Sequence, residues 1–320
     1  MIMSNASMKT ASDSQHRLGL IAISIASVFS ALMGVSFFMA HQVDPGFSSF
    51  SGSFIRVLTN LVFIIFLPFG LRSTSRTERP VLLSPKRHPS LWLWGTFGAL
   101  TVTTYFGAVN LVGNGMAALI GASSGVFITA LAPILTKQKV DSKNWVAVIG
   151  SIAGLILMCQ SQTQNPRTEL YRLGLLLAMT SGLFGALAYL MIARTRTRYS
   201  TAAIMTTWCV VSIIAHLILF SCYQTVWPVG LAAWCLLLMA GLAASLAQHF
   251  TTYSFQRVPA STVASLSYLA PVLSLAFDVV LFGLKPSYRQ ELGAGLIVAF
   301  GAILPMIKKP SPNLKRIGIQ

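Results

Sequence analysis

Charged side chains are scarce in this sequence. Asp, Glu, Lys and Arg make up 9% of its 320 residues, and Asp and Glu together number only 7. Soluble domains carry about 25% charged residues, so this deficit excludes a protein whose surface lies mainly in water. Apolar residues instead make up 54% of the chain, and the mean hydropathy is +0.70. The composition therefore indicates a surface that faces lipid.

The sequence also lacks the short motifs of metal and cofactor chemistry. None of its 4 cysteines is spaced as CxxC or paired with a histidine in a zinc-binding pattern. It contains no HExxH pair, P-loop or dinucleotide-binding fingerprint. We therefore expect no metal, no cofactor and no enzymatic activity.

Basic residues outnumber acidic ones, and the 23 Lys and Arg give a formal net charge of +16. A basic chain can bind nucleic acid by replacing the counterions of phosphates. Here the cations lie in short clusters between long apolar runs, a pattern typical of membrane topology signals. We expect these basic residues to lie at the surface of a lipid bilayer, and we expect no nucleic-acid partner.

Long apolar runs dominate the chain. About 20 apolar residues are needed to cross the hydrocarbon core of a bilayer as a helix, and the first run is too long for a signal peptide. Trp92 and Trp94 begin one run, as in an interfacial aromatic belt. We expect an all-α polytopic membrane protein with ten transmembrane helices at 18–40, 50–70, 91–112, 116–136, 145–159, 173–192, 202–222, 229–249, 261–283 and 292–306.

The distribution of Lys and Arg predicts the orientation of these helices. Cytoplasmic loops carry an excess of positive charge. Placing the N-terminus in the cytoplasm leaves only Arg167, Arg172, Lys285 and Arg289 outside, with Arg56 inside a span. We therefore expect both termini on the cytoplasmic side of a bacterial inner membrane. Residues 1–17 are expected to form a disordered cytoplasmic tail and residues 308–320 a basic one.

The chain also contains a weak internal repeat. The residues Arg-Leu-Gly-Leu at 17–20 recur at 172–175, and further matches follow along both halves. Coincidental similarity among apolar residues is the alternative explanation. A true repeat divides the chain into five-helix units at 18–160 and 172–307. Because five is odd, the two units enter the membrane from opposite sides, an architecture that recurs in transporters.

Several segments resemble the EamA-type transporters of the drug/metabolite transporter superfamily. The resemblance rests on Phe-Gln-Arg-Val-Pro-Ala at 255–260, on Tyr-Leu-Ala-Pro-Val at 268–272, and on Met33-Gly34, Pro45 and Arg56. It implies a basket of ten helices that moves small polar metabolites, often amino acids or related compounds, and commonly exports them. Import of a metabolite by the same fold is the alternative.

The sequence departs from this pattern at several positions. Gln138 stands where the family usually has a Glu after its fourth span, and Leu284 or Lys285 stands at the corresponding position after the ninth. Ser124 replaces the Pro typical of the fourth span, whereas Pro271 keeps its counterpart in the ninth. The resemblance therefore gives no basis for a coupling role of the missing acids.

Two charges fall inside the predicted spans. A charged side chain within hydrocarbon costs about 2.5 kcal/mol or more, so Arg56 and Asp278 each require an explanation. Both fall in the outer half of the membrane. They can form a structural ion pair; alternatively, Arg56 can capture a substrate carboxylate or act in gating, and Asp278 can carry a coupling proton.

Other polar or helix-breaking residues are candidates for the substrate pathway. Histidine can relay protons, tyrosine and amide groups can bind a solute, and a proline within a helix frees a backbone carbonyl. Ordinary packing is the alternative for each, and also for His216. The candidates beside Arg56 and Asp278 are Tyr105, Asn110, Gln248, His249, Tyr268 and Pro271.

Residues 121–125, Gly-Ala-Ser-Ser-Gly, match the GxSxG pattern of serine hydrolases. That motif requires a strand-to-helix turn, whereas here it lies inside a predicted span, where Gly121 and Gly125 favour close helix packing. An intramembrane hydrolase would need Ser123 to meet a histidine. A structural membrane protein without a cavity is a third possibility. We expect a transporter of a small-molecule substrate and leave open whether it forms a homodimer.

Overall fold

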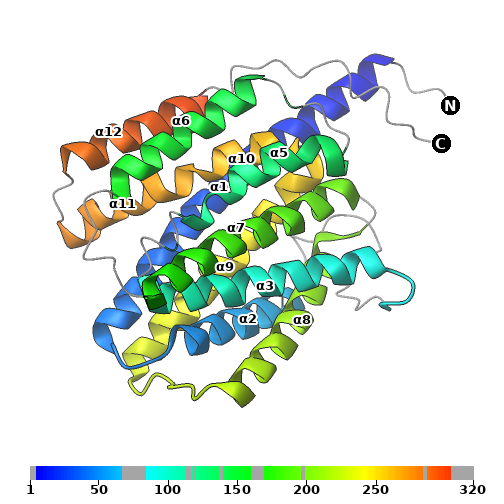
Figure 1. Ribbon diagram of the computed structural model, residues 1–320. Coiled ribbons are helices and arrows are strands. Elements are labelled where there is room, and N and C mark those ends of the chain that lie inside the picture. The colour runs from blue at the N-terminus through cyan, green and yellow to red at the C-terminus, as the bar shows by residue number, and fades with distance from the viewer. Residues whose placement is uncertain are drawn as a thin grey trace.

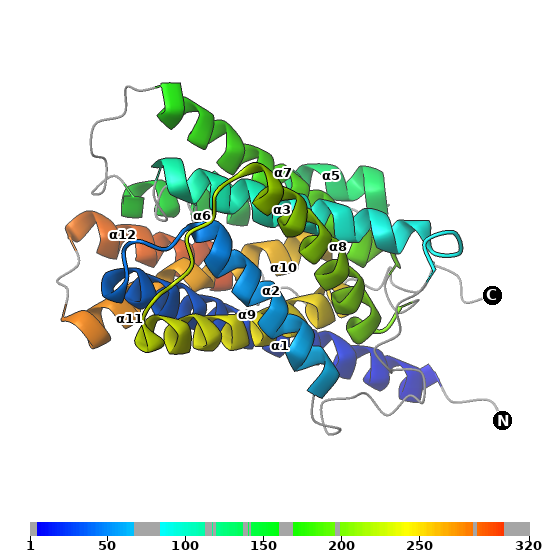
Figure 2. The same cartoon turned by 90° about the horizontal axis from the view of Figure 1, so that it is seen from below.

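The computed structural model describes residues 5–66, 84–112, 117, 120–136, 140, 142–159, 169–195, 199–283 and 287–303. Every regular element within these residues is helical (Figures 1 and 2). The helices are α1 (Asn5–Val43), α2 (Ser49–Phe66), α3 (Pro89–Val112), α5 (Ser124–Thr136), α6 (Ser142–Cys159), α7 (Glu169–Thr195), α8 (Thr201–Cys222), α9 (Leu231–Arg257), α10 (Ala260–Ser267), α11 (Leu269–Phe282) and α12 (Tyr288–Leu296), which continues into the π-helix η2 (Ile297–Ile303).

Within the described residues, six helical segments are long and apolar enough to cross a membrane. They are Ser14–Val43, Ser49–Phe66, Glu169–Arg194, Thr201–Cys222, Leu231–Arg257 and Ala260–Leu281. Large apolar side chains on their outer surfaces are more than half exposed, among them Leu176, Ile218 and Val280. Such a surface suits lipid rather than water. The chain is therefore a polytopic α-helical membrane protein, and the count of ten spans stays a prediction.

The N-terminal segment differs from the expected disordered tail. Helix α1 begins at Asn5, so residues 5–17 are helical and continue directly into the first span. The segment contains no Gly or Pro and includes Ala, Met, Lys and Gln, which are good helix formers. Once the apolar part of α1 is helical, these residues only extend an existing helix. Residues 308–320 lie outside the described part of the chain.

The closest helix pairs join residues far apart in sequence. Helix α1 runs antiparallel to α9, since Gly19 lies against Val258 and Phe29 stacks on Phe250 with ring centroids 6.4 Å apart. Helix α3 runs antiparallel to α7 in the same way (Figure 1). There Phe97 stacks on Phe184 with ring centroids 6.1 Å apart. Each of these pairs takes one helix from residues 18–160 and one from residues 172–307.

Further contacts also join helices from the two halves of the chain. Helix α2 packs against α9, with Gly241 against the side chain of Thr59, and α8 packs against α3, with Gly98 against the indole of Trp208. Helix α6 packs against α12, with Gly154 against the backbone of Gly293. Glycine removes the side chain at each point of approach, which is how helices come close in a membrane.

The helical segment 260–282 is interrupted at Tyr268. Helix α10 ends at Ser267 and α11 begins at Leu269. Pro271 lies in the first turn of α11, where its missing N–H needs no intrahelical acceptor. The proline therefore starts a new helix here and does not kink a continuous one.

Candidate functional site

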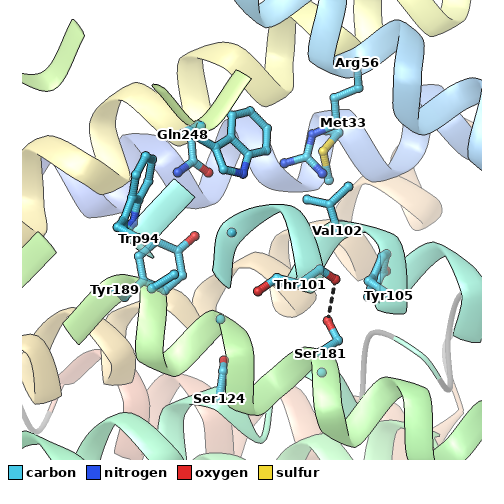
Figure 3. A pocket seen from close by; sticks show the side chains of 15 residues that line it. Met33, Arg56, Trp94, Thr101, Val102, Tyr105, Ser124, Ser181, Tyr189 and Gln248 are labelled. Atoms are coloured by element: carbon cyan, nitrogen blue, oxygen red, sulfur yellow. Dashed lines mark hydrogen bonds between the residues drawn. The ribbon is translucent and has the colours of Figure 1, made fainter. Parts of the chain in front are cut away.

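A cavity of about 260 Å³ lies among the helices. Side chains from α1, α2, α3, α7, α8 and α9, and from residues 121–124, surround it (Figure 3). The lining residues are Met33, Arg56, Trp94, Gly98, Thr101, Val102, Tyr105, Gly121, Ser124, Ser181, Gly185, Ala188, Tyr189, Trp208 and Gln248. Drug-sized ligands occupy pockets of roughly 300–1,000 Å³, so this cavity suits one small solute. It is bounded by residues of both predicted halves.

Arg56 is the charged residue of this lining. Its side chain extends from α2 toward α3, and its guanidinium lies beside Met33 and Val102 (Figure 3). Its Nε atom is buried and has no hydrogen-bond partner among the described residues. Among the described residues, the ion pair that forms is between Arg172 and Glu169 on the exposed start of α7, so no described carboxylate neutralises Arg56. The guanidinium charge is therefore directed into the cavity.

Aromatic rings form much of the cavity wall. Tyr105 and Tyr189 lie within electrostatic range of Arg56. Tyr189 is held by Phe255, which stacks on it with ring centroids 4.5 Å apart at an interplanar angle of 10°. Trp94 was expected at the membrane interface, and that expectation is wrong, because its side chain is 3% exposed and lines the cavity. Its indole Nε1 is buried and has no hydrogen-bond partner within the described structure.

Neutral polar groups complete the lining. Ser181 Oγ donates a hydrogen bond to the carbonyl oxygen of Thr101 at 2.9 Å, which ties α7 to α3 at the cavity wall (Figure 3). Thr101 Oγ1 donates to the carbonyl oxygen of Phe97 at 2.8 Å, within its own helix. The amide of Gln248 faces the cavity from α9 (Figure 3). The site therefore combines one cation, several aromatic rings and a few uncharged hydrogen-bonding groups.

Three of the predicted pathway residues, Arg56, Tyr105 and Gln248, thus line one cavity. Two others are buried in helix contacts. Tyr268 donates from its hydroxyl to the carbonyl oxygen of Ala122 at 2.9 Å. His249 lies edge-on to Phe250 with ring centroids 5.5 Å apart and is 8% exposed. Neither is among the cavity-lining residues.

Two predicted residues lie where the structure describes no side chain. Asn110 is in α3 and Asp278 is in α11, but their side chains lie outside the described part of the structure. Helix α11 packs against α1 and η2, whereas α2, which carries Arg56, packs against α3, α8 and α9. The pairing of Arg56 with Asp278 stays a prediction. The described residues of α11, Pro271 included, do not line the cavity.

His216 has a structural explanation. Its Nδ1 donates to the carbonyl oxygen of Ser212 at 2.7 Å, and its Nε2 lies 3.0 Å from Ser53 Oγ. The ring is fully buried, so both nitrogens are satisfied between α8 and α2. This geometry favours the packing interpretation over proton relay.

Ser123 lacks the partner that a hydrolase would require. Its Oγ is buried, lies close to Gly182 of α7 and makes no hydrogen bond to any described residue. Among the described residues there is also no group of three or more His, Cys, Asp or Glu side chains placed to hold a metal ion. The GxSxG pattern here marks close packing between α7 and the start of α5.

The spacing of residues along a helix predicts cavity-lining residues, such as Trp94, that composition alone did not identify. Trp94, Gly98, Thr101 and Tyr105 are spaced by four, three and four residues, so they form one stripe along α3. A stripe of polar, aromatic and small residues on an otherwise apolar helix indicates a face turned away from lipid. The spacing of Ser181, Gly185 and Ala188 on α7 repeats that signal.

Comparison with known proteins agrees with this architecture. The EamA-like transporter family matches residues 17–160 and 172–304. A riboflavin transporter of Vibrio cholerae is 25% identical over 208 residues, which cover 65% of this chain and 64% of that protein. A pseudopaline exporter of Pseudomonas aeruginosa is 24% identical over 230 residues, covering 72% and 79%. A solved crystal structure shares the fold with a TM-score of 0.74 at 20% identity, covering 91% of this chain and 96% of that one.

These relatives are named for transport, and the family is one of transporters rather than enzymes. Transporters act on small molecules within a lipid bilayer. A polytopic helical protein with a small cavity among its helices is consistent with that role. Because the two family matches together cover most of the sequence and follow the two predicted repeats, the chain belongs to the EamA-like transporter family.

Proposed function

We propose that the protein moves small polar metabolites across the bacterial inner membrane by alternating access, and that it exports amino acids or related compounds. The observation that carries the proposal is the cavity bounded by both halves of the chain. A substrate site at the interface of two repeats can be opened to either side by rearranging them. The proposal includes ten spans and cytoplasmic termini.

The packing of the helices supports a two-fold relation between residues 18–160 and 172–307. Exchanging the halves turns the contact of α1 with α9 into that of α7 with α3, and both contacts are present. It also turns the contact of α2 with α9 into that of α8 with α3, and both are again present. The contacts of α2 with α8 and of α6 with α12 are their own counterparts.

Helix directions support an inverted relation. Helices α3 and α8 run parallel. His88, just before α3, lies against Tyr199, just before α8, and Gly98 farther along α3 lies against Trp208 farther along α8. Helix α7 runs antiparallel to α3, as shown by the pairing of Phe97 with Phe184 and of Gly107 with Leu177. In Figure 1, α1 and α7, the first helices of the two halves, run in opposite directions.

Contacts at the two ends of the bundle supply candidate gates. We define the outer rim as the connection after α1 together with the connection before α9. Here the Val229 amide donates to Asp44 Oδ2 at 2.9 Å, the Ser48 amide donates to the Val226 carbonyl at 3.0 Å, and Ser51 Oγ donates to the same carbonyl at 2.9 Å. These bonds join the two halves at one end of the molecule.

The inner rim is defined by the symmetry counterparts of these connections. Tyr199, between α7 and α8, places its hydroxyl 3.3 Å from Nδ1 of His88 and 3.5 Å from Oγ of Ser90, at the start of α3. The inner rim therefore also joins one half to the other. Breaking one rim while the other holds would open the cavity to one side at a time, as alternating access requires.

The direction of transport is supported by the relatives. One of them is named an exporter, and export is also what the sequence resemblance implied. Import by the same rearrangement is the second candidate, because the riboflavin transporter of Vibrio cholerae is named without a direction. The dimeric state plays no part in the proposal, since the cavity is complete within one chain.

A proteoliposome screen tests the proposal. Purified protein is reconstituted, and release of preloaded amino acids and other polar metabolites is measured with and without a proton gradient. We expect saturable efflux of at least one compound above protein-free liposomes, reduced by Arg56→Ala and unchanged by Arg172→Gln, which lies in an exposed ion pair. Impermeant labelling of cysteines added at each terminus should report both on the cytoplasmic face. Termini on opposite faces would refute the inverted topology.

A further inference from the structure

The cavity holds a cation and a tyrosine at one side, and a tryptophan and a second tyrosine at the other. Arg56 and Tyr105 lie toward one side of the close-up, and Trp94 and Tyr189 lie toward the opposite side with Gln248 (Figure 3). Val102 lies on the same side as Arg56 (Figure 3). The described lining is therefore polarised along the cavity, with one positive charge and no described negative charge.

Few described groups are placed to bind the guanidinium of Arg56. Its Nε is buried without a described hydrogen-bond partner. The described carboxylates are placed elsewhere: Asp44 at the outer rim, Glu169 in its exposed pair with Arg172, and Glu291 exposed in the first turn of α12. A guanidinium within a membrane is expensive unless an anion or several acceptors approach it. Guanidinium groups bind carboxylates strongly because their planar geometries match.

The opposite side favours a flat, largely apolar group. Indole and phenol rings stack on other rings, and Tyr189 is fixed in place by its own stacking on Phe255. At the cavity wall, Gly98 lets the indole of Trp208 approach α3 closely, and Gly185 lies against the side chain of Thr101. A volume of about 260 Å³ admits one small ring system with a short substituent, and little more.

We propose that the preferred ligand is a monocarboxylate attached to a planar ring, with its carboxylate on Arg56 and its ring beside Trp94 and Tyr189. This inference rests on the proposed transport function and narrows its substrate class, from amino acids and related compounds, to related acids that carry no ammonium group. It also separates simple aromatic acids from amino acids. The ammonium group of an amino acid would enter a cavity that already carries a cation and has no described carboxylate to receive it.

Four indole compounds test the charge requirement directly. Indole-3-acetate, indole-3-acetamide, tryptamine and tryptophan share one ring but differ in charge. Their binding to the full-length protein in lipid nanodiscs can be measured by isothermal titration calorimetry, with empty nanodiscs to subtract partition into lipid. We expect saturable binding of indole-3-acetate, with the other three compounds at least tenfold weaker. Equal affinities across the series, no saturable binding of indole-3-acetate, or tighter binding of tryptophan would each overturn the inference.

Variants of Arg56 test whether this residue binds the carboxylate of the ligand. Arg56→Gln should weaken indole-3-acetate binding at least tenfold and leave indole-3-acetamide binding unchanged, and the amide thereby checks that the variant is folded. Arg56→Lys should retain part of the affinity, because it keeps the charge but loses the planar fork. Arg172→Gln is the matched control and should bind like the unaltered protein. If indole-3-acetate binds Arg56→Gln within twofold of the unaltered protein, Arg56 does not select the ligand.

The substrate class and the transport function can fail separately. If the proteoliposome screen finds efflux of a neutral or cationic metabolite and none of indole-3-acetate, the protein is a transporter and the inference about its substrate is wrong. If indole-3-acetate binds in the expected manner but no solute crosses the membrane, the binding site stands and the transport mechanism fails.

Discussion

Weakening one rim at a time should shift the protein toward the state open at that rim. Asp44→Ala removes the acceptor for the Val229 amide at the outer rim, a bond of 2.9 Å. Tyr199→Phe removes the hydroxyl that lies 3.3 Å from His88 at the inner rim. Each hydrogen bond contributes about 0.5–1.5 kcal/mol net. Loss of about 1 kcal/mol changes a two-state equilibrium by roughly fivefold.

Thiol labelling from each side of the membrane measures this shift. A cysteine replaces Ser124, which lines the cavity, in a chain whose native cysteines are replaced. An impermeant maleimide is then added to right-side-out or inside-out vesicles. We expect Asp44→Ala to speed labelling from the outside by several-fold and Tyr199→Phe to speed it from the inside.

A control in the same loop makes the result specific. Thr225 lies in the connection before α9, and within the described structure its hydroxyl donates only to the carbonyl oxygen of Tyr223 in the same connection. Thr225→Ala should therefore leave both labelling rates unchanged. If Asp44→Ala and Tyr199→Phe accelerate labelling from the same side, or neither changes a rate by more than twofold, the rims are not opposing gates.

Three further predictions concern packing, and each is read as a shift in the thermal unfolding temperature of the purified protein in detergent. Gly98→Ala should destabilise the protein by about 1–3 kcal/mol because the added methyl meets an indole ring, whereas Gly34→Ala, which has open space around it, should be neutral or stabilising by up to about 1 kcal/mol. Tyr268→Phe should cost about 1 kcal/mol through its lost interhelical hydrogen bond, and Tyr288→Phe on the exposed start of α12 should cost less than about 0.5 kcal/mol. Ser123→Ala should reduce neither stability nor transport, because it removes a buried hydroxyl that has no described partner; a loss of either would revive a chemical role for this serine.

The sequence predicted the helices better than it predicted what each helix touches. Apolar length alone indicates a helix in lipid, and the predicted segments overlap α1, α2, α3, α6, α7, α8 and α9. The segment predicted at 116–136 is instead interrupted by a turn at Ala122 and Ser123, so that α5 begins at Ser124. A break near Pro271 could be anticipated from the proline, but the break lies at Tyr268, whose hydroxyl donates to the carbonyl oxygen of Ala122. That contact joins residues 146 positions apart.

The cavity residues likewise differ in how far the sequence alone could predict them. Arg56 stood out in the sequence because a charge in hydrocarbon is conspicuous, and it does line the cavity. Trp94 did not stand out, because a tryptophan near a helix end is equally typical of the membrane interface. Whether its ring meets lipid or a cavity depends on α7 and α8, which pack against α3 but follow it in the sequence by many residues.

The interleaving of α1 with α9, and of α3 with α7, has a consequence for biosynthesis. The face of α1 that α9 covers is exposed to lipid until the chain has been made as far as residue 257, since α9 is Leu231–Arg257. The first five hydrophobic segments therefore leave the translocon without their principal partners. We expect that a fragment ending near residue 160 inserts into the bilayer but acquires protease resistance only when the remaining residues are supplied, on the same chain or as a second polypeptide.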